Sequence, residues 1–451
     1  MSVVLLIPGC ISLFLVLRGR IKTAFLSVYL PSLLLLPDEY SYKIPHLPLL
    51  SAAEYALIPI GVVALTRHIR SGSFRLMDAL VFSFWVSLSI TEISREPVMN
   101  DGILCAAGVF VSQLLAYAVG RQLIEPDLRF ETARRWSIFV LLLAPFGIYE
   151  WWTAQRVYGI LGQKLHLPDM WSTVPVRNGR GRLSVSLGGG ELTGIAIGVT
   201  FALNAWLVIL KKARKGVNLG KWLTRLEKYH VPGLVFLLCL WMTQSRGPMI
   251  ATVAGYLIIQ IARFKTTKLA TGLVAILLAI GALQAQQYYA DYTAGRVNYR
   301  DEERASAQYR RKMNIVYQSI AASGGWLGWA GQMPVVEGQK SIDNQFLLTH
   351  LIQGELGYIL LILIMAESIR NGIASVWSIQ TLEDRAFACC MLAIFVIFWI
   401  SYYTVFMGGP LPQITFLMLG WGQSFVPRKK SSGFAAKAQS PSESPLQRVL
   451  T

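Results

Sequence analysis

Charged residues are scarce in this chain: Asp, Glu, Lys and Arg make up 15% of its 451 residues, against 54% for the apolar types. A single soluble core stops growing well below this length, so no soluble domain needs so much apolar sequence. The apolar residues also come in blocks, most of them close to the ~20 residues with which a helix crosses a bilayer. The scarcity of charge therefore excludes a soluble globular protein and favours a membrane protein.

Signatures of metal, disulfide and nucleotide sites are missing as well. The cysteines form no CxxC pair and lie near no histidine cluster, so neither a disulfide framework nor a metal site is indicated. There is no Walker-type phosphate loop, no GxGxxG after a strand and no internal repeat. No pair of metal-binding carboxylates is evident either. We therefore expect no cofactor and no metal.

What the chain has instead is a series of apolar blocks, which predict an all-α polytopic membrane protein with about 12 or 13 transmembrane helices. The first block resembles a signal peptide too, but a cleavable signal carries its charge before the apolar run, and here Arg18, Arg20 and Lys22 follow it. The blocks are 3–17, 23–36, 51–66, 77–92, 102–119, 136–151, 191–210, 231–244, 248–262, 269–285, 345–366, 386–404 and 411–426.

The net charge of +17 is explained by membrane topology rather than by nucleic-acid binding. Lys and Arg cluster in alternate loops, and the positive-inside rule places all of these loops on the cytoplasmic side. The N-terminus is then outside if the first block spans, and the C-terminus is inside. The basic loops are 18–22, 67–75, 121–135, 211–228, 263–268 and 428–430.

This threading leaves two long segments outside and divides the chain into six parts. A large outward loop lies between late helices, and the Ser/Pro/Ala-rich tail is predicted to be disordered. The parts are N-terminal membrane helices (1–151), a first outward loop (152–190), central membrane helices (191–285), the large outward loop (286–344), C-terminal membrane helices (345–430) and a cytoplasmic tail (431–451).

Both outward loops are rich in arginine, against the positive-inside rule. The planar fork of arginine suits bidentate binding of phosphate or carboxylate better than a lysine does. The alternative is that these arginines pair with nearby acidic residues or touch lipid headgroups. Arg246 has no acidic neighbour in sequence, and we expect Gly247 and Pro248 to form a short outer turn that holds it at the membrane surface.

The large outward loop carries two further patterns. Residues 302–322 place Met313, Val316 and Tyr317 at helical spacing, which predicts an amphipathic helix at the membrane–water boundary. The "GGWLGWAGQ" stretch that follows suits stacking on sugar rings or anchoring at the interface, and both alternatives stay open.

Asp343 and Asn344 stand at the outer mouth of the next helix, where such residues commonly act as helix caps. His350 lies about two turns deeper, as a functional or a packing histidine. Gly354 and Gly357 leave room for close helix packing.

Three stretches together resemble the O-antigen ligase/polymerase superfamily of bacterial envelope glycosyltransferases. They are "RLSVSLGGGELTG" (182–194), "TQSRGPMI" (243–250) and "DNQFLLTHLIQGELG" (343–357). Their order, spacing and sidedness agree with that family over about residues 180–365. Two positions depart from it: Glu191 stands where the family often has Asn, and Asp343 stands where ligases have His. The Asp-Asn start looks more like the polymerase-type members.

The resemblance implies a GT-C-like multi-pass protein of the bacterial inner membrane with a periplasmic active face. It implies an inverting, metal-independent transfer that polymerises or ligates undecaprenyl-pyrophosphate-linked glycan onto a sugar or lipid acceptor during O-antigen (lipopolysaccharide) or exopolysaccharide biosynthesis. Membrane lipids and other polysaccharide-assembly proteins are the implied partners. A transporter or flippase of lipid-linked sugars is the alternative; it predicts charge at mid-membrane and broken helices.

The leaving group of such a transfer is a pyrophosphate, so positive charge is needed where negative charge develops. We expect Arg246 and Asp343 to be catalytic, with Asp343 taking the proton of the acceptor hydroxyl. Asn344 is expected to orient Asp343. The residues expected to bind substrate are Arg182, Arg310, Arg311, Asn344 and His350.

Overall fold

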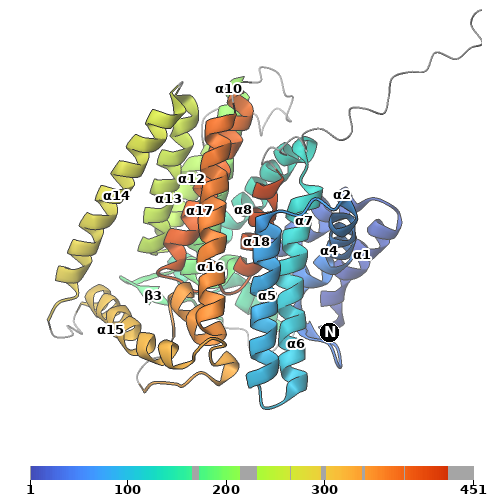
Figure 1. Ribbon diagram of the computed structural model, residues 1–451, viewed down its shortest axis with the longest axis horizontal. Helices are drawn as coiled ribbons and strands as arrows, with labels where there is room; N and C mark the ends of the chain where they lie inside the picture. Colours follow the sequence, from blue (N-terminus) through green and yellow to red (C-terminus); the bar gives the residue numbers. More distant parts are fainter. Residues whose placement is uncertain are drawn as a thin grey trace, which may run out of the picture.

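The computed structural model describes residues 2–164, 172–213, 231–264, 266–295, 301–337, 341–379 and 381–424. In this part of the chain the protein is a bundle of helices with two small antiparallel strand pairs (Figure 1). Every apolar block recognised in the sequence corresponds to a helical segment. The all-α prediction is confirmed.

In the first half of the chain, two π-helical turns, η2 and η3, each join two α-helices end to end. The helices of this half precede or begin the first long loop. They are η1 (Ser2–Leu6), α1 (Ile7–Leu17), α2 (Ile21–Ala24), η2 (Phe25–Tyr29), α3 (Leu30–Leu35), α4 (Ala52–Ser71), α5 (Leu76–Arg95), α6 (Met99–Val109), η3 (Phe110–Leu115), α7 (Ala116–Leu123), α8 (Pro126–Thr153) and α9 (Val157–Lys164).

The helices of the second half of the chain include the longest described helix, α16. They are η4 (Val185–Leu187), α10 (Gly190–Ala213), α12 (Val231–Met242), α13 (Arg246–Gln260), η5 (Ile261–Arg263), α14 (Thr267–Tyr292), α15 (Glu302–Ser323), η6 (Ala330–Gln332), α16 (Gln345–Ser378), α17 (Leu382–Tyr402) and α18 (Leu411–Gln423). The strand pairs are β1 (Ser41–Lys43) with β2 (Leu49–Ser51) and β3 (Val176–Arg177) with β4 (Arg180–Gly181).

Six helical segments of the described chain are long and apolar enough to cross a membrane. The protein is therefore a multi-pass membrane protein, whereas the larger total of about 12 or 13 spans stays a prediction. The six are Leu76–Arg95, Met99–Leu123, Gly190–Leu210, Thr267–Tyr292, Gln345–Ser378 and Leu382–Tyr402. Shorter apolar helices are Val3–Leu17, Ile21–Leu35 and Val231–Met242.

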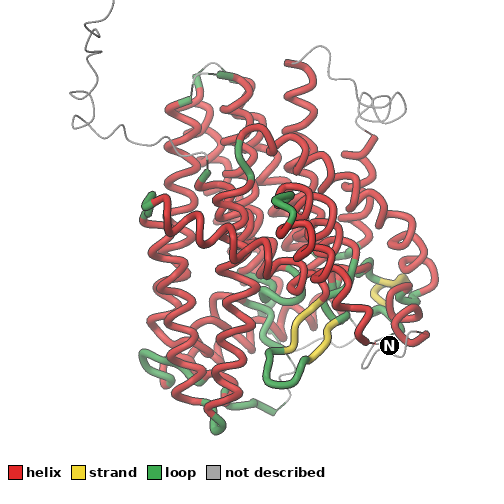
Figure 2. Tube along the Cα trace, turned by 90° about the vertical axis from the view of Figure 1, so that its right-hand side faces the viewer, coloured by secondary structure: helices red, strands yellow, loops and turns green. Residues whose placement is uncertain are grey.

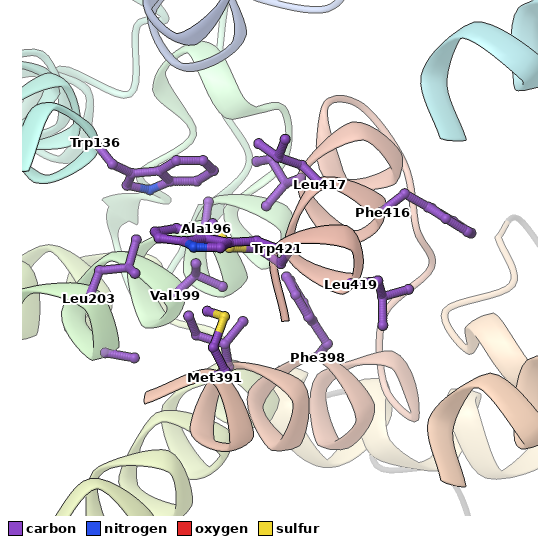
Figure 3. Packing of buried hydrophobic residues seen from close by; sticks show 14 of the residues in the cluster. Trp136, Ala196, Val199, Leu203, Met391, Phe398, Phe416, Leu417, Leu419 and Trp421 are labelled. Carbon is purple, nitrogen blue, oxygen red and sulfur yellow. The ribbon is translucent and has the colours of Figure 1, made fainter. Parts of the chain in front are cut away.

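The core lies where α8, α10, α17 and α18 meet. Trp421 of α18 is surrounded there by Trp136 of α8 and by Met391 and Phe398 of α17 (Figure 3). Trp136 donates a hydrogen bond from its ring nitrogen to the hydroxyl of Thr200 on α10 at 3.0 Å, which satisfies its polar atom inside the bundle.

Small residues allow the closest helix crossing, between α7 and α18. A Cβ atom at Gly120 would overlap the carbonyl oxygen of Leu417, and one at Gly420 would overlap that of Tyr117. Glycine on both partners lets the two backbones touch, as in many membrane-helix pairs.

The loops lie on two opposite faces of the bundle. One, the α15 face, carries α15, both strand pairs and the first residues of the chain, at the lower end in Figures 1 and 2. Loops far apart in sequence are joined on it: Met407 N–H donates to Gln345 Oε1 at 2.6 Å, and Gln332 Nε2 donates to Glu96 at 3.3 Å. The α15 face is built from described residues of 36–51, 96–98, 153–190, 243–247, 293–345 and 403–410.

Loops predicted to be cytoplasmic are joined in the same way on the opposite face. Lys22 pairs with Asp127 at 2.9 Å, and Arg385 Nε donates to the carbonyl of Ala262 at 3.2 Å. The described parts of these loops thus lie together, whereas residues 214–228 and 428–430 lie outside the described chain. The side of the membrane on which each face lies stays a prediction.

Helix α14 stands apart from the rest of the bundle (Figure 1). Only 6% of its apolar stretch is buried, against 83% for α10 and for α17. The predicted amphipathic helix that follows is α15, and its apolar residues Met313 and Tyr317 pack with Leu347 and Leu351 of α16. Much of the apolar face of α15 therefore covers protein.

Gly354 interrupts α16 with a left-handed backbone (φ 66°). The Gly-rich turn 324–328 enters the break, where Glu355 N–H donates to the carbonyl of Gly325 at 3.1 Å. A Cβ atom at Gly354 would overlap the backbone of Gly325 and Gly328. The expectation that Gly354 serves close packing between helices is wrong, because its close neighbour is this turn.

Candidate functional site

Arg182 is the buried centre of the α15 face. Its three guanidinium nitrogens have three different partners: Nε donates to the carbonyl of Thr243 at 3.1 Å, Nη2 donates to Ser245 Oγ at 2.7 Å, and Nη1 pairs with Glu191 Oε1 at 2.6 Å. Arg182 therefore joins the first outward loop to the α12–α13 turn and to the start of α10. Its hydrogen-bonding capacity is largely used within the protein.

The turn between α12 and α13 is formed by the residues before Arg246, not by Gly247 and Pro248. α12 ends at Met242, the chain reverses through Gln244 in a left-handed conformation (φ 52°), and α13 begins at Arg246. Gly247 and Pro248 lie inside the first turn of α13, where proline is tolerated because it has no helical partner for an N–H. The prediction that they form the turn is wrong.

Gly247 instead permits a close approach by the loop before α18. A Cβ atom there would overlap the hydroxyl of Thr404. Arg246 itself is exposed at the N-terminus of α13, where the helix dipole adds to its positive charge.

The positive charges of three other arginines on the α15 face act on Arg177. Burial lowers the pKa of Arg177, and the positive charges of Arg182, Arg310 and Arg246 lower it further, against the single opposing charge of Glu191. We call Arg177, Arg182, Arg246 and Arg310 the arginine group. It comes from the first outward loop, the α12–α13 turn and α15, and its charge favours an anionic ligand.

Asp343 lies at the edge of the arginine group. Its Oδ2 is 3.6 Å from Nε of Arg310, and its Oδ1 accepts a hydrogen bond from Ser341 Oγ at 2.9 Å. Asp343 and Arg310 each expose about a quarter of the side chain, 27% and 28%. A carboxylate and a guanidinium are therefore presented side by side to solvent.

Asn344 is the N-cap of α16. Its Oδ1 accepts hydrogen bonds from the backbone N–H groups of Phe346 and Leu347 at 3.0 and 3.2 Å, and its amide donates to Asn314 Oδ1 at 3.4 Å. These contacts agree with the capping alternative left open by the sequence.

Two further expected site residues bind other parts of the protein. Arg311 Nη1 donates to Thr293 Oγ1 at 3.3 Å and so ties α15 to the end of α14. His350 Nε2 lies 3.1 Å from Glu355 Oε1, and its ring stacks on Tyr358 across the break in α16. The structure thus assembles Arg182, Arg246, Arg310 and Asp343, and gives Arg311 and His350 separate partners.

Glu150 is a positioning residue that the sequence analysis missed. It is fully buried at the end of α8, and its Oε2 accepts hydrogen bonds from the N–H groups of Ser184 and Val185 at 3.0 and 2.8 Å. It thereby fixes the loop that carries Arg182. The available signal was an acidic residue at the end of an apolar block.

The sequence analysis also missed a cavity of about 380 Å³ on the α15 face. We call it the acidic pocket, since three carboxylates line it. Burial raises the pKa of one of them, Asp38, to about 6, with a further contribution from the charge of Glu39. Its lining residues are Asp38, Glu39, Ser41, Leu49, Ser51, Glu54, Gly188, Gly189, Leu192 and Gly409.

Among the described residues, no group of three or more His, Cys, Asp or Glu side chains is arranged to hold a metal ion. Segments 182–194 and 243–250 of the family resemblance meet on the α15 face through the bonds of Arg182, and segment 343–357 begins on the same face, where Asp343 pairs with Arg310 of α15. Comparison with known proteins finds no family model, no curated protein and no solved structure that matches this chain.

Proposed function

We propose that this protein is a membrane glycosyltransferase that polymerises or ligates lipid-pyrophosphate-linked oligosaccharides in exopolysaccharide or O-antigen biosynthesis. The observation that carries the proposal is the arginine group at the helix ends of the α15 face, with the carboxylate of Asp343 beside it. We assign the α15 face to the periplasmic side of the bacterial inner membrane, because the basic loops gather on the opposite face.

The arginine group supplies what a pyrophosphate leaving group requires. Fixed guanidinium groups stabilise charge that develops on phosphate oxygens, and they do so without reorganising during the reaction. Arg246 is exposed at the N-terminus of α13, a position that itself favours anions. Arg246 and Arg310 therefore contact the pyrophosphate, whereas Arg182 positions the turn that carries Arg246.

Asp343 is the proposed general base. The acceptor oxygen forms a bond to the anomeric carbon while the bond from that carbon to the phosphate oxygen breaks. The acceptor proton passes to Asp343, and the electron pair leaves with the pyrophosphate. A single displacement of this kind inverts the anomeric centre.

The membrane-facing surface fits a donor that stays anchored in lipid. α14 exposes apolar side chains along most of its length, and its end is tied to α15, the helix that carries Arg310. A polyprenyl chain in the bilayer would bring its pyrophosphate to the level of these helix ends.

Charge reversal at Arg246 tests this function. We expect Arg246→Glu to abolish polysaccharide assembly in cells, and Asp343→Asn to reduce it by 100-fold or more, in the range of a lost general base. Lys312→Glu is the matched control, an exposed charge reversal on the same helix as Arg310 that we expect to be neutral. Unchanged glycan in Arg246→Glu, at equal protein levels, would return Arg246 to the role of a lipid-headgroup anchor.

The glycan made by a strain that lacks the protein separates polymerase activity from ligase activity. Glycan of single repeat units in a deletion strain indicates a polymerase. Full-length chains that lack their final acceptor indicate a ligase.

A flippase of lipid-linked sugars is the second candidate: it predicts broken helices, and α16 is broken at Gly354. The buried ionic cluster of the described chain lies at the ends of α4, α5 and α7 rather than at mid-membrane. Asp78 of α5 lies 3.5 Å from His68 Nε2 and 3.6 Å from Arg121 Nε, and all three are nearly enclosed. A flippase requires the lipid-linked unit to stay in the inner leaflet when the protein is lost. Its accumulation in the outer leaflet of a deletion strain excludes this candidate.

A further inference from the structure

The acidic pocket is assigned no part in the proposed glycosyl transfer at the arginine group and Asp343. It holds three carboxylates and two hydroxyls, with Leu49 and Leu192 as apolar walls. Its volume of about 380 Å³ is in the range of pockets that hold small organic ligands.

The acidic pocket and the arginine group share a wall. Gly188 and Gly189 line the pocket, and the next residue, Gly190, lies against Arg182: a Cβ atom there would be 3.2 Å from its Nε. Glu191, the ion-pair partner of Arg182, follows directly. The pocket is therefore separated from Arg182, the buried member of the arginine group, by one backbone segment.

Another lining residue of the pocket, Gly409, lies near the segment that carries Asp343. Met407, two residues before Gly409, donates its N–H to Gln345 at 2.6 Å. Gln345 follows Asp343 by two residues. The pocket, the arginine group and the proposed base thus lie next to one another on one face.

Local geometry keeps the pocket open and rigid. Gly188 has φ 95° and Gly409 has φ 54°, conformations that favour residues without a side chain. Strand pairing sets Ser41 opposite Ser51, which brings both hydroxyls to one place.

The carboxylates are held in position as well. Glu54 Oε2 accepts hydrogen bonds from the N–H and the hydroxyl of Ser51 at 2.8 and 3.1 Å. Glu39 pairs with Arg156 at 2.8 Å. Because these acceptors are already fixed before a ligand arrives, binding loses less conformational entropy than it would with mobile side chains.

The chemistry of the lining selects the ligand. Ionised carboxylates only accept hydrogen bonds, and the many hydroxyls of a sugar ring are matching donors. The leucines and the bare glycine backbone suit the apolar C–H face of the ring. A diphosphate is repelled by the carboxylates, so charge alone directs it to the arginine group.

We propose that the acidic pocket is the acceptor subsite, which binds an uncharged sugar through its hydroxyl groups next to the donor pyrophosphate. This inference rests on the proposed function. It assigns the two substrates to two adjoining sites of opposite charge.

Binding measurements on the full-length protein in nanodiscs test the proposal. Saturation-transfer NMR with glucose, galactose, N-acetylglucosamine and N-acetylgalactosamine probes the acidic pocket, and inorganic pyrophosphate titration probes the arginine group. We expect the double variant Asp38→Asn/Glu54→Gln, and separately Gly189→Leu, to weaken sugar binding at least tenfold. Pyrophosphate binding should stay unchanged in both.

Two variants serve as references. Glu96→Gln changes a half-buried carboxylate of the α15 face outside the pocket and should keep both kinds of binding. Arg246→Ala should lose pyrophosphate binding and keep sugar binding. Elution volume and thermal unfolding check that each variant is folded.

The outcomes distinguish the two proposals. Sugar binding that survives in both pocket variants, or is absent from the parent protein, overturns the acceptor subsite. The proposal is also overturned if the pocket binds a cation and none of the sugars, and if Asp38→Asn/Glu54→Gln loses that cation. Absence of pyrophosphate binding from the parent protein, or its persistence in Arg246→Ala, contradicts the proposed function instead.

Discussion

Two arginines of the α15 face show how burial decides what a side chain does. Arg182 is 7% exposed and donates to a carbonyl, a hydroxyl and a carboxylate of its own chain. Arg246 is exposed at a helix N-terminus. The same residue type is therefore used for internal bonding in one position and is exposed on the surface in the other, where the proposed ligand would bind.

This difference predicts a specific effect of Arg182→Lys. A lysine ammonium on a flexible stem cannot reach all three acceptors in the geometry of the guanidinium fork, so at least one charged hydrogen bond is lost. We expect the variant to be less stable by about 2–3 kcal/mol. The measurement is the thermal unfolding temperature in detergent.

Arg177→Lys is the matched control for Arg182→Lys. Arg177 donates one identified hydrogen bond, from Nη1 to the carbonyl of Gln244 at 3.1 Å, so a lysine should cost less there. Equal unfolding temperatures for the two variants would contradict the anchoring role of Arg182.

At the scale of elements, the break in α16 determines how the large outward loop meets the bundle. The turn 324–328 enters the break, and Trp329 N–H donates to the carbonyl of Leu351 at 2.8 Å. The backbone groups freed by the break are thus bound by the turn. This satisfies the requirement for hydrogen bonding near the membrane.

Gly354→Ala tests this junction. An L-residue at the backbone angles of Gly354, φ 66° and ψ −162°, a region essentially restricted to glycine, costs roughly 1–3 kcal/mol, and the overlap of its Cβ atom with the turn adds to that. We expect a lower unfolding temperature and weaker glycan assembly, because the turn and the loop bearing Arg310 and Asp343 are displaced together.

The control is Gly272→Ala in α14. Gly272 is helical and has open space around its missing Cβ atom, so alanine should leave stability unchanged or raise it slightly. If both substitutions behave alike, the turn is not held by the break.

At the scale of the whole molecule, the basic loops and the proposed site lie on two opposite faces. The described parts of the basic loops lie on one face, and the arginine group with Asp343 and the acidic pocket lies on the other. The proposed reaction needs the second face to be outside, where lipid-linked glycans are assembled.

Labelling with a membrane-impermeant maleimide tests this orientation. In a background whose native cysteines are replaced by alanine, we expect Ser323→Cys at the end of α15 to react in cells with a permeable outer membrane. Ser71→Cys at the end of α4 should react only after lysis. The reverse pattern would contradict both the positive-inside threading and the periplasmic active face.

The sequence predicted the helices well because the signal is local. In a bilayer every backbone group must be bonded within its own segment, so a block of apolar residues is a helix whatever packs against it. The amphipathic spacing of Met313 and Tyr317 is local in the same sense. The grouping of loops into two faces followed from charge, which each loop also carries by itself.

Local sequence patterns could not predict which groups individual side chains bind. Nothing near Arg182 in sequence indicates that Thr243 and Ser245 would use up its donors, or that Gln244 would make the turn expected at Gly247 and Pro248. The break at Gly354 depends likewise on a turn that arrives from the preceding loop.

The sequence by itself thus determined the helical membrane class, the positions of the helices and the presence of two long arginine-rich loops. Only the tertiary structure decided which arginines are enclosed and that a carboxylate pocket adjoins them. The pocket collects residues from 38–54, 188–192 and 409, and such distant segments meet only through the order in which the helices pack. Composition acts on each segment alone, whereas a site depends on their arrangement.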